Sequence, residues 1–239
     1  MSPFSDATAS VLLGTAASLA AVHTLIGVDH SVPFIVLGRA RRWSLRRTLG
    51  VTGVCGLVHV LSSVLIGLVG VAIGVALERL SWLESARGTV AAWLLIGFGL
   101  AYAAWFSWRS LRGQVHTHRH THLDGMTHSH AHNHHGQHLH PHGLGGGATP
   151  WALFLVFAFG PCEALIPLMM VPAIDASWWL LAAVVSVFAF FTVGAMLAAV
   201  ALGYIGLTRA RLGVFEQRVD VLAGLTVAAS GIAVLLLGI

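Results

Sequence analysis

The chain has 239 residues, of which 56% are apolar and only 9% charged, against about 25% charged residues in a typical soluble domain. Its 13 basic residues are all arginine, and they are balanced by only 9 acidic residues. So few charges exclude a soluble enzyme, a disulfide-stapled secreted module and a disordered chain. A mean hydropathy of +0.82 instead predicts a membrane protein that crosses the bilayer several times.

Six stretches with at most one Asp, Glu or Arg are long enough to span a bilayer, which takes about 20 apolar residues per helix. They show none of the polar alternation of a membrane β-barrel. We therefore predict an all-α membrane protein with six transmembrane helices, over residues 7–28, 48–77, 88–108, 150–174, 176–208 and 221–239.

The arginines fall in alternate loops, and this predicts the orientation. Eleven of the 13 lie in the first, third and fifth loops, whereas the second loop has Arg79 and Arg87, offset by Glu78 and Glu84. Loops rich in Lys and Arg stay in the cytoplasm. We expect a multi-pass protein of a bacterial inner membrane, with both termini outside. The basic composition then reflects topology and not nucleic-acid binding.

The two halves of the chain resemble each other. Residues 60–70 align without gaps with residues 196–206, sharing Leu, Val and two Gly at the same offsets. Gly27-Val28-Asp29-His30, followed by a Pro, parallels Gly160-Pro161-Cys162-Glu163, also followed by a Pro. Three spans per half predict two repeats of opposite orientation. Inverted repeats place substrate near the midplane, at helices broken by Gly and Pro.

This repeat divides the chain into three parts. The first three-helix repeat is expected at residues 1–111 and the second at residues 150–239, separated by a His-rich loop at residues 112–149.

Ionisable side chains inside membrane spans are costly and mark functional sites. Here they comprise three imidazoles and two carboxylates, with the thiols of Cys55 and Cys162 as neighbours. Such donors suit Ni²⁺, Co²⁺ or Zn²⁺, whereas Ca²⁺ prefers more oxygen ligands. The predicted metal site is His23, Asp29, His30, His59, Cys162 and Glu163.

Geometry leaves alternatives open for these residues. His23 and His30 are seven residues apart, a rise of about 10.5 Å on a straight helix. Either the helix unwinds near Gly27, or the two imidazoles serve successive sites. Asp29 is a candidate to orient an imidazole, or to relay protons with His30. His59 is equally a ligand or an interhelical hydrogen-bond donor, and Cys55 is expected to be a small buried apolar residue.

Twelve of the 15 histidines lie between residues 116 and 142. Such a composition cannot build a core and predicts a flexible, cytoplasmic metal-binding tract that buffers or senses metal. A pH sensor and a solubilising spacer are the competing interpretations. The accessory ligands are His116, His118, His120, His122, His128, His130, His132, His134, His135, His138, His140 and His142.

The segment from His23 to His30, with GLVHVLSSVLIG of the second span, resembles the nickel/cobalt transporters. It is closer still to their urease-accessory-type and sulfite-exporter-like relatives in the lysine-exporter superfamily. The nickel/cobalt permeases carry a first-span His, four residues, then Asp-His; here five residues separate His23 from Asp29. The resemblance implies that His23, Asp29, His30 and His59 line a metal pathway.

Two other classes remain. GPCEALIP, residues 160–167, is similar to the Pro-Cys motif of membrane thiol-electron carriers, which would use Cys162 and Cys55. A sulfite-type anion exporter would line its path with Arg, and no Arg is predicted deep within a span.

The favoured function is a secondary transporter of divalent transition metals, with Ni²⁺ or Co²⁺ as the preferred cargo, and not an enzyme. We expect no permanently bound cofactor. The expected partners are the metal ion and the lipid bilayer, with protons as a candidate coupling ion and a homo-oligomer as a candidate assembly.

Overall fold

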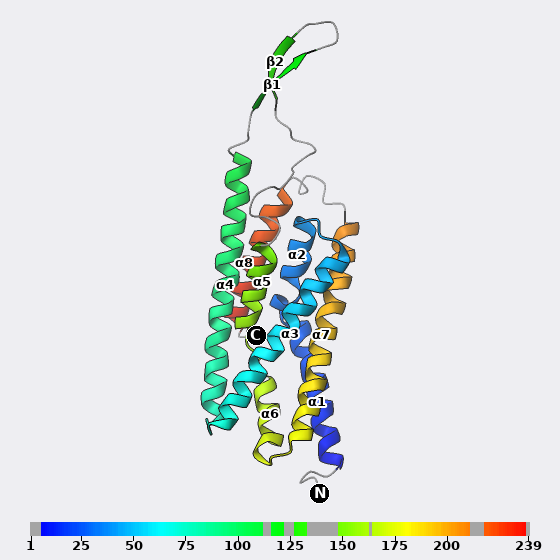
Figure 1. The fold of residues 1–239 in the computed structure, drawn as a ribbon, viewed down its shortest axis with the longest axis vertical. Coiled ribbons are helices and arrows are strands. Elements are labelled where there is room, and N and C mark those ends of the chain that lie inside the picture. Colours follow the sequence, from blue (N-terminus) through cyan, green and yellow to red (C-terminus); the bar gives the residue numbers. More distant parts are fainter. Residues whose placement is uncertain are drawn as a thin grey trace.

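The computed structural model describes residues 6–111, 116–121, 127–132, 148–162, 164–210 and 218–237. This part is an elongated bundle of helices with a small hairpin at one end (Figure 1). In chain order the elements are α1 (Asp6–Ile26), η1 (Val28–His30), α2 (Val32–Ala40), α3 (Leu45–Ala72), α4 (Leu77–Leu111), β1 (His116–Thr121), β2 (Thr127–His132), α5 (Ala148–Phe159), α6 (Leu165–Ile174), α7 (Trp178–Arg209) and α8 (Val219–Leu237).

Five of these helices, α1, α3, α4, α7 and α8, are long and apolar enough to cross a membrane. Their outward faces carry many exposed large apolar side chains, such as Trp179, Leu202 and Leu236. Both features fit a multi-pass membrane protein. The predicted fourth span is different, because it is divided into α5 and α6, each too short to span a bilayer alone.

Two helices are interrupted, and the sequence explains where. Helix α1 ends at Ile26, and the chain passes through Gly27 and the single turn η1 before α2 begins with Pro33 in its first turn. Helix α5 ends at Phe159, just before Gly160-Pro161. Proline cannot donate a backbone hydrogen bond, and its ring disfavours a helical conformation at the preceding residue. Of the two arrangements expected around Gly27, the structure has the unwound one.

Helix α4 corrects the predicted second loop. It begins at Leu77 and runs for 35 residues, so Glu78, Arg79, Glu84 and Arg87 all lie within it. The side chain of Glu84 is fully buried and that of Arg87 is only 11% exposed. The expectation that no Arg lies inside a spanning helix was therefore wrong for Arg87. Charge alone suggested a loop, but Glu84 and Arg87 neutralise each other across one turn of α4, and hydroxyl and backbone groups far away in the sequence complete their hydrogen bonds.

Helices α4 and α8 pack together closely along their length. Small residues make this possible: a Cβ added to Gly99 would lie 2.5 Å from the Gly224 carbonyl oxygen, and one added to Gly231 would lie 2.7 Å from the Ala92 oxygen. Helix α1 packs mainly on α7 instead. Side chains of α1 line one side of a cavity and those of α4 and α8 another.

The His-rich segment contains an antiparallel hairpin where a flexible tract was predicted. Its register pairs His116 with His132, His118 with His130 and His120 with His128. The rest of this segment lies outside the described residues, including the predicted accessory ligands His122, His134, His135, His138, His140 and His142.

Candidate metal centre

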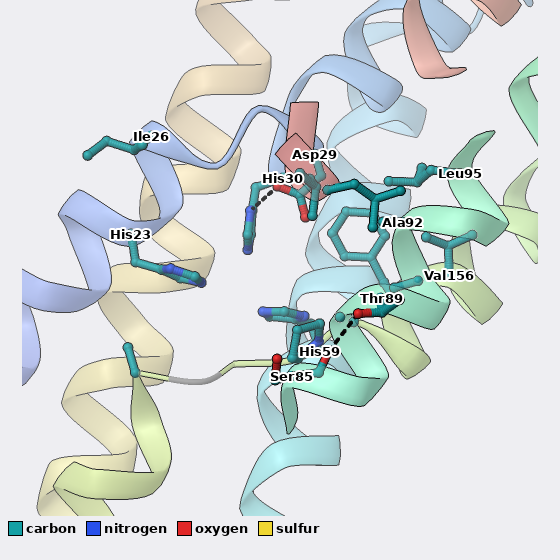
Figure 2. Close-up of a pocket in the computed structure, with 18 of the residues that line it drawn as sticks. His23, Ile26, Asp29, His30, His59, Ser85, Thr89, Ala92, Leu95 and Val156 are labelled. Atoms are coloured by element: carbon teal, nitrogen blue, oxygen red, sulfur yellow. Dashed lines mark hydrogen bonds and ion pairs between the residues drawn. The ribbon is translucent and has the colours of Figure 1, made fainter. Parts of the chain in front are cut away.

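Three imidazoles converge inside the bundle from three separate elements. His23 lies in the last turn of α1, His30 ends η1, and His59 lies in the middle of α3. One ring nitrogen from each lies within 4.8 Å of the others. The ring centroids of His23 and His30 are 5.0 Å apart, and those of His30 and His59 are 5.1 Å apart. Figure 2 shows the three rings facing one another.

The helix break is what brings two of these residues together. On a straight helix His23 and His30 would be separated by about 10.5 Å of rise. Because α1 ends at Ile26, the chain turns, and His30 is carried back towards His23. Gly27 makes room for this turn, since a Cβ there would lie 2.3 Å from His30 Nδ1 and 3.0 Å from Asp29 Oδ1.

Asp29 orients the central imidazole. Its Oδ1 lies 2.9 Å from His30 Nδ1 (Figure 2). An ionised carboxylate can only accept hydrogen bonds, so Nδ1 must donate, which leaves the lone pair of a neutral ring on Nε2. A carboxylate that fixes the tautomer of a ligating histidine in this way is a regular feature of metal sites.

The nitrogens that remain have no protein partner. His23 Nε2, His30 Nε2 and both ring nitrogens of His59 are buried and make no hydrogen bond in the described part of the chain. His30 and His59 are only 3% and 2% exposed. Buried polar atoms without a partner are unfavourable and call for an explanation. For His59, the expected alternative of an interhelical hydrogen bond is not observed among the described residues.

The cluster opens onto a cavity of about 590 Å³. Its walls come from α1, η1, α3, α4, the end of α5 and the end of α8. Most of the lining is apolar, but Ser85 and Thr89 of α4 add hydroxyl groups to the wall. Such a space can hold a metal ion together with several of its water molecules.

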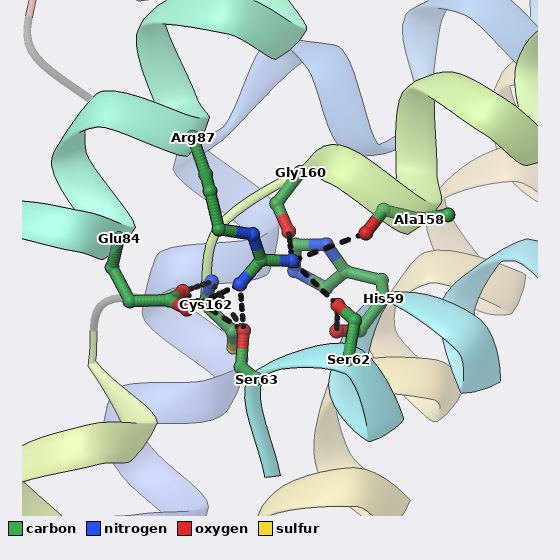
Figure 3. A network of polar contacts seen from close by, with 8 residues as sticks. All are labelled: His59, Ser62, Ser63, Glu84, Arg87, Ala158, Gly160 and Cys162. Atoms are coloured by element: carbon green, nitrogen blue, oxygen red, sulfur yellow. Dashed lines mark hydrogen bonds and ion pairs between the residues drawn. The ribbon is translucent and has the colours of Figure 1, made fainter. Parts of the chain in front are cut away.

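A second polar network lies beside His59, and the sequence did not reveal it (Figure 3). Arg87 forms a short ion pair with Glu84 and donates to the carbonyl oxygens of Ala158 and Gly160, at 3.1 and 3.2 Å. Glu84 Oε2 accepts hydrogen bonds from the backbone N–H of Cys162 and from the Ser63 hydroxyl, both at 2.9 Å. The sequence signal that was available is the i, i+3 spacing of Glu84 and Arg87, typical of a helix face.

The other predicted ligands have different positions. Cys162 is buried but does not belong to the three-histidine group found among the described residues. It contributes its backbone N–H to Glu84 and Ser63. Glu163 lies outside the described residues. The two thiols pack in different core clusters, Cys55 with Phe34 and Met196, and Cys162 with Leu165 and Phe188.

Comparison of the chain with protein-family models, with curated proteins and with solved structures found no match.

Proposed function

We propose that this protein is a secondary transporter of divalent transition metal ions, with Ni²⁺ or Co²⁺ as its preferred cargo. The observation that carries the proposal is the group of three buried imidazoles, whose facing nitrogens lack any partner in the described residues. Imidazole suits Ni²⁺, Co²⁺ and Zn²⁺, whereas hard cations such as Mg²⁺ and Ca²⁺ prefer oxygen.

The chemistry of the cluster favours a cargo that must leave again. Nitrogens bound to one tetrahedral ion would be separated by roughly 3.4 Å, given metal–nitrogen distances of about 2.1 Å. The three ring nitrogens lie within 4.8 Å of one another, so small side-chain movements would bring them to the separation that one ion requires. Three neutral ligands leave coordination positions for water, and a transport site must bind strongly enough to capture an ion but weakly enough to release it.

The arrangement of helices supports two inverted halves. In Figure 1 the broken pair α1–α2 runs upwards and the broken pair α5–α6 runs downwards. The packing is reciprocal as well: α1 of the first half packs on α7 of the second half, and α5 of the second half packs on α3 of the first half. With α5 and α6 together counted as one broken span, the chain would cross the membrane six times. Rocking of one half against the other would expose the cluster to each side in turn.

The His-rich hairpin lies at the same end of the molecule as the α2–α3 connection, where Arg41, Arg42, Arg46 and Arg47 cluster (Figure 1). The positive-inside rule places such an end in the cytoplasm of a bacterial inner membrane. There the tract would bind metal before export or after import, as an accessory to the buried site.

The decisive test is metal flux in proteoliposomes, with Ni²⁺, Co²⁺, Zn²⁺ and Mn²⁺ compared under an imposed pH gradient. The intact chain, a deletion of residues 116–142 and the variant His30→Ala are measured side by side. Saturable Ni²⁺ or Co²⁺ flux that survives the deletion and is lost in His30→Ala is the expected result. The absence of flux for all four metals would contradict the proposal and favour the thiol-electron carrier.

A further inference from the structure

The break between α5 and α6 creates an electrostatic problem inside the bundle. Wherever a helix ends, its last carbonyl groups and first N–H groups lack intrahelical partners. Lipid offers no hydrogen bonds, so at membrane depth these groups must find partners in the protein or in a water-filled cavity. At this break, Pro161 has no N–H to offer, and the backbone of Gly160-Pro161-Cys162 is not helical.

Glu84 and Arg87 supply the missing partners, each at the appropriate end. The Arg87 guanidinium binds the carbonyl oxygens of Ala158 and Gly160 at the C-terminal end of α5. The Glu84 carboxylate accepts the N–H of Cys162, on the side from which α6 begins. A cation at a helix C-terminus and an anion near a helix N-terminus both interact favourably with the helix dipoles. One ion pair from α4 therefore stabilises both sides of the break.

The same network contacts the backbone that carries His59. Arg87 donates to the Ser62 hydroxyl at 2.8 Å, and Ser62 donates in turn to the His59 carbonyl oxygen, also at 2.8 Å (Figure 3). Gly160, held by Arg87, lies against the imidazole of His59: a Cβ at this position would be 3.0 Å from His59 Nδ1. The position of the break thus limits where the His59 ring can lie.

The break also forms a wall of the cavity. Phe157, Gly160, Pro161 and Ala164 line it from the α5–α6 side. On α4, Ser85, Gly88 and Thr89 line the same cavity immediately beside the ion pair. A change in the Glu84–Arg87 pair would consequently move both the cavity wall and one of the three imidazoles.

We propose that Glu84 and Arg87 are positioning residues of the metal centre, which hold the α5–α6 break against His59. This proposal rests on the proposed metal transport for its functional consequence. The structural part, a clamp on the break, stands on the contacts of the ion pair and can be tested separately.

The clamp is tested by the reactivity of Cys162 with a membrane-permeant maleimide in the full-length protein. In the wild type both thiols are buried, and we expect both to react slowly. Glu84→Gln and Arg87→Lys should speed labelling of Cys162 at least tenfold while Cys55, in α3, stays protected. Glu78→Gln and Arg79→Lys, at exposed positions in the first turn of the same helix, are the matched controls.

A charge reversal distinguishes the clamp from a simple ion pair. The double variant Glu84→Arg/Arg87→Glu retains opposite charges but presents each to the wrong helix end. We expect no restoration of Cys162 protection. Full protection in the reversed pair would overturn the clamp, as would unchanged Cys162 reactivity in both single variants. Equal acceleration at Cys55 and Cys162 would assign the pair to overall stability and also overturn it.

The functional consequence is measured as Ni²⁺ flux in proteoliposomes. Positioning of His59 predicts that KM for Ni²⁺ rises about tenfold in Arg87→Lys, as for other residues that support metal ligands, with a smaller change in the maximal rate. If labelling of Cys162 is accelerated but KM for Ni²⁺ is unchanged, the clamp on the break stands, and the proposal that it positions His59 is overturned. If the wild type transports none of Ni²⁺, Co²⁺, Zn²⁺ and Mn²⁺, the proposed function fails, whereas Cys162 reactivity still decides the clamp.

Discussion

Asp29 is the residue that fixes the tautomer of His30 in the proposed metal site. It accepts a hydrogen bond from His30 Nδ1 and so directs the lone pair of Nε2 towards the other imidazoles. Asp29→Asn removes the negative charge and allows the other tautomer. We expect KM for Ni²⁺ flux to rise roughly ten- to hundredfold. Asp6→Asn, at an exposed position in the first turn of α1, is the control and should leave KM unchanged. An unaltered KM in Asp29→Asn would mean that His30 needs no orienting partner.

Gly27 is a second position where one atom decides the geometry. An added methyl group would lie 2.3 Å from His30 Nδ1, too close for the ring to remain in place. Gly27→Ala should therefore reduce Ni²⁺ flux about as strongly as Asp29→Asn. Gly14→Ala, within α1, is the control, because nothing lies within 4 Å of its added Cβ. Flux at the wild-type level in Gly27→Ala would contradict the observed position of His30.

At the scale of single residues, the sequence predicted the members of the site better than their roles. His23, His30 and His59 stood out because an imidazole inside an apolar stretch is rare. A hydrogen bond from His30 to Asp29, which the orienting role requires, is present; the role itself was foreseen as one alternative and stays a prediction. Glu84 and Arg87 were missed, since their partners are the backbone at residues 158–162 and hydroxyls of α3. Partners so distant in sequence leave no local pattern.

Among the helices, the contact between α4 and α8 depends on small residues. The backbones approach so closely at Gly99 that an added Cβ would lie 2.5 Å from both Ala228 N and the Gly224 carbonyl oxygen. Gly99→Ala should destabilise the folded protein by about 1–3 kcal/mol through overpacking. Thermal unfolding of the detergent-solubilised protein measures this as a lower Tm. Gly97→Ala, with open space around its Cβ, is the control. An equal Tm for both variants would show that α4 and α8 can separate at no cost.

The element boundaries show what hydropathy can and cannot predict. Long apolar stretches marked α3, α7 and α8 to within a few residues, because each helix must cover the bilayer thickness. Hydropathy failed at the start of α4, where Glu84 and Arg87 neutralise each other. It also gave no sign of the interruption between α5 and α6, since residues 160–162 are as compatible with an apolar stretch as with a break. Gly-Pro was the only local sign of the interruption.

For the whole molecule, the arrangement of charges leads to a prediction about topology. The α2–α3 connection, rich in arginine, and the His-rich hairpin lie at one end of the bundle, and α1 begins at the other (Figure 1). If the arginine-rich end is cytoplasmic, an epitope inserted between residues 121 and 127 is shielded in intact cells. An epitope fused ahead of residue 6 is exposed.

Antibody access before and after opening of the inner membrane of spheroplasts measures both epitopes in parallel. The expected result is binding to the N-terminal epitope at once and to the hairpin epitope only after opening. The opposite pattern would reverse the topology. In that case the His-rich tract would meet metal outside the cell and could act only as an external metal trap. Access to both epitopes in intact cells would be incompatible with an odd number of crossings between residues 6 and 121, and so with α1, α3 and α4 as three complete spans.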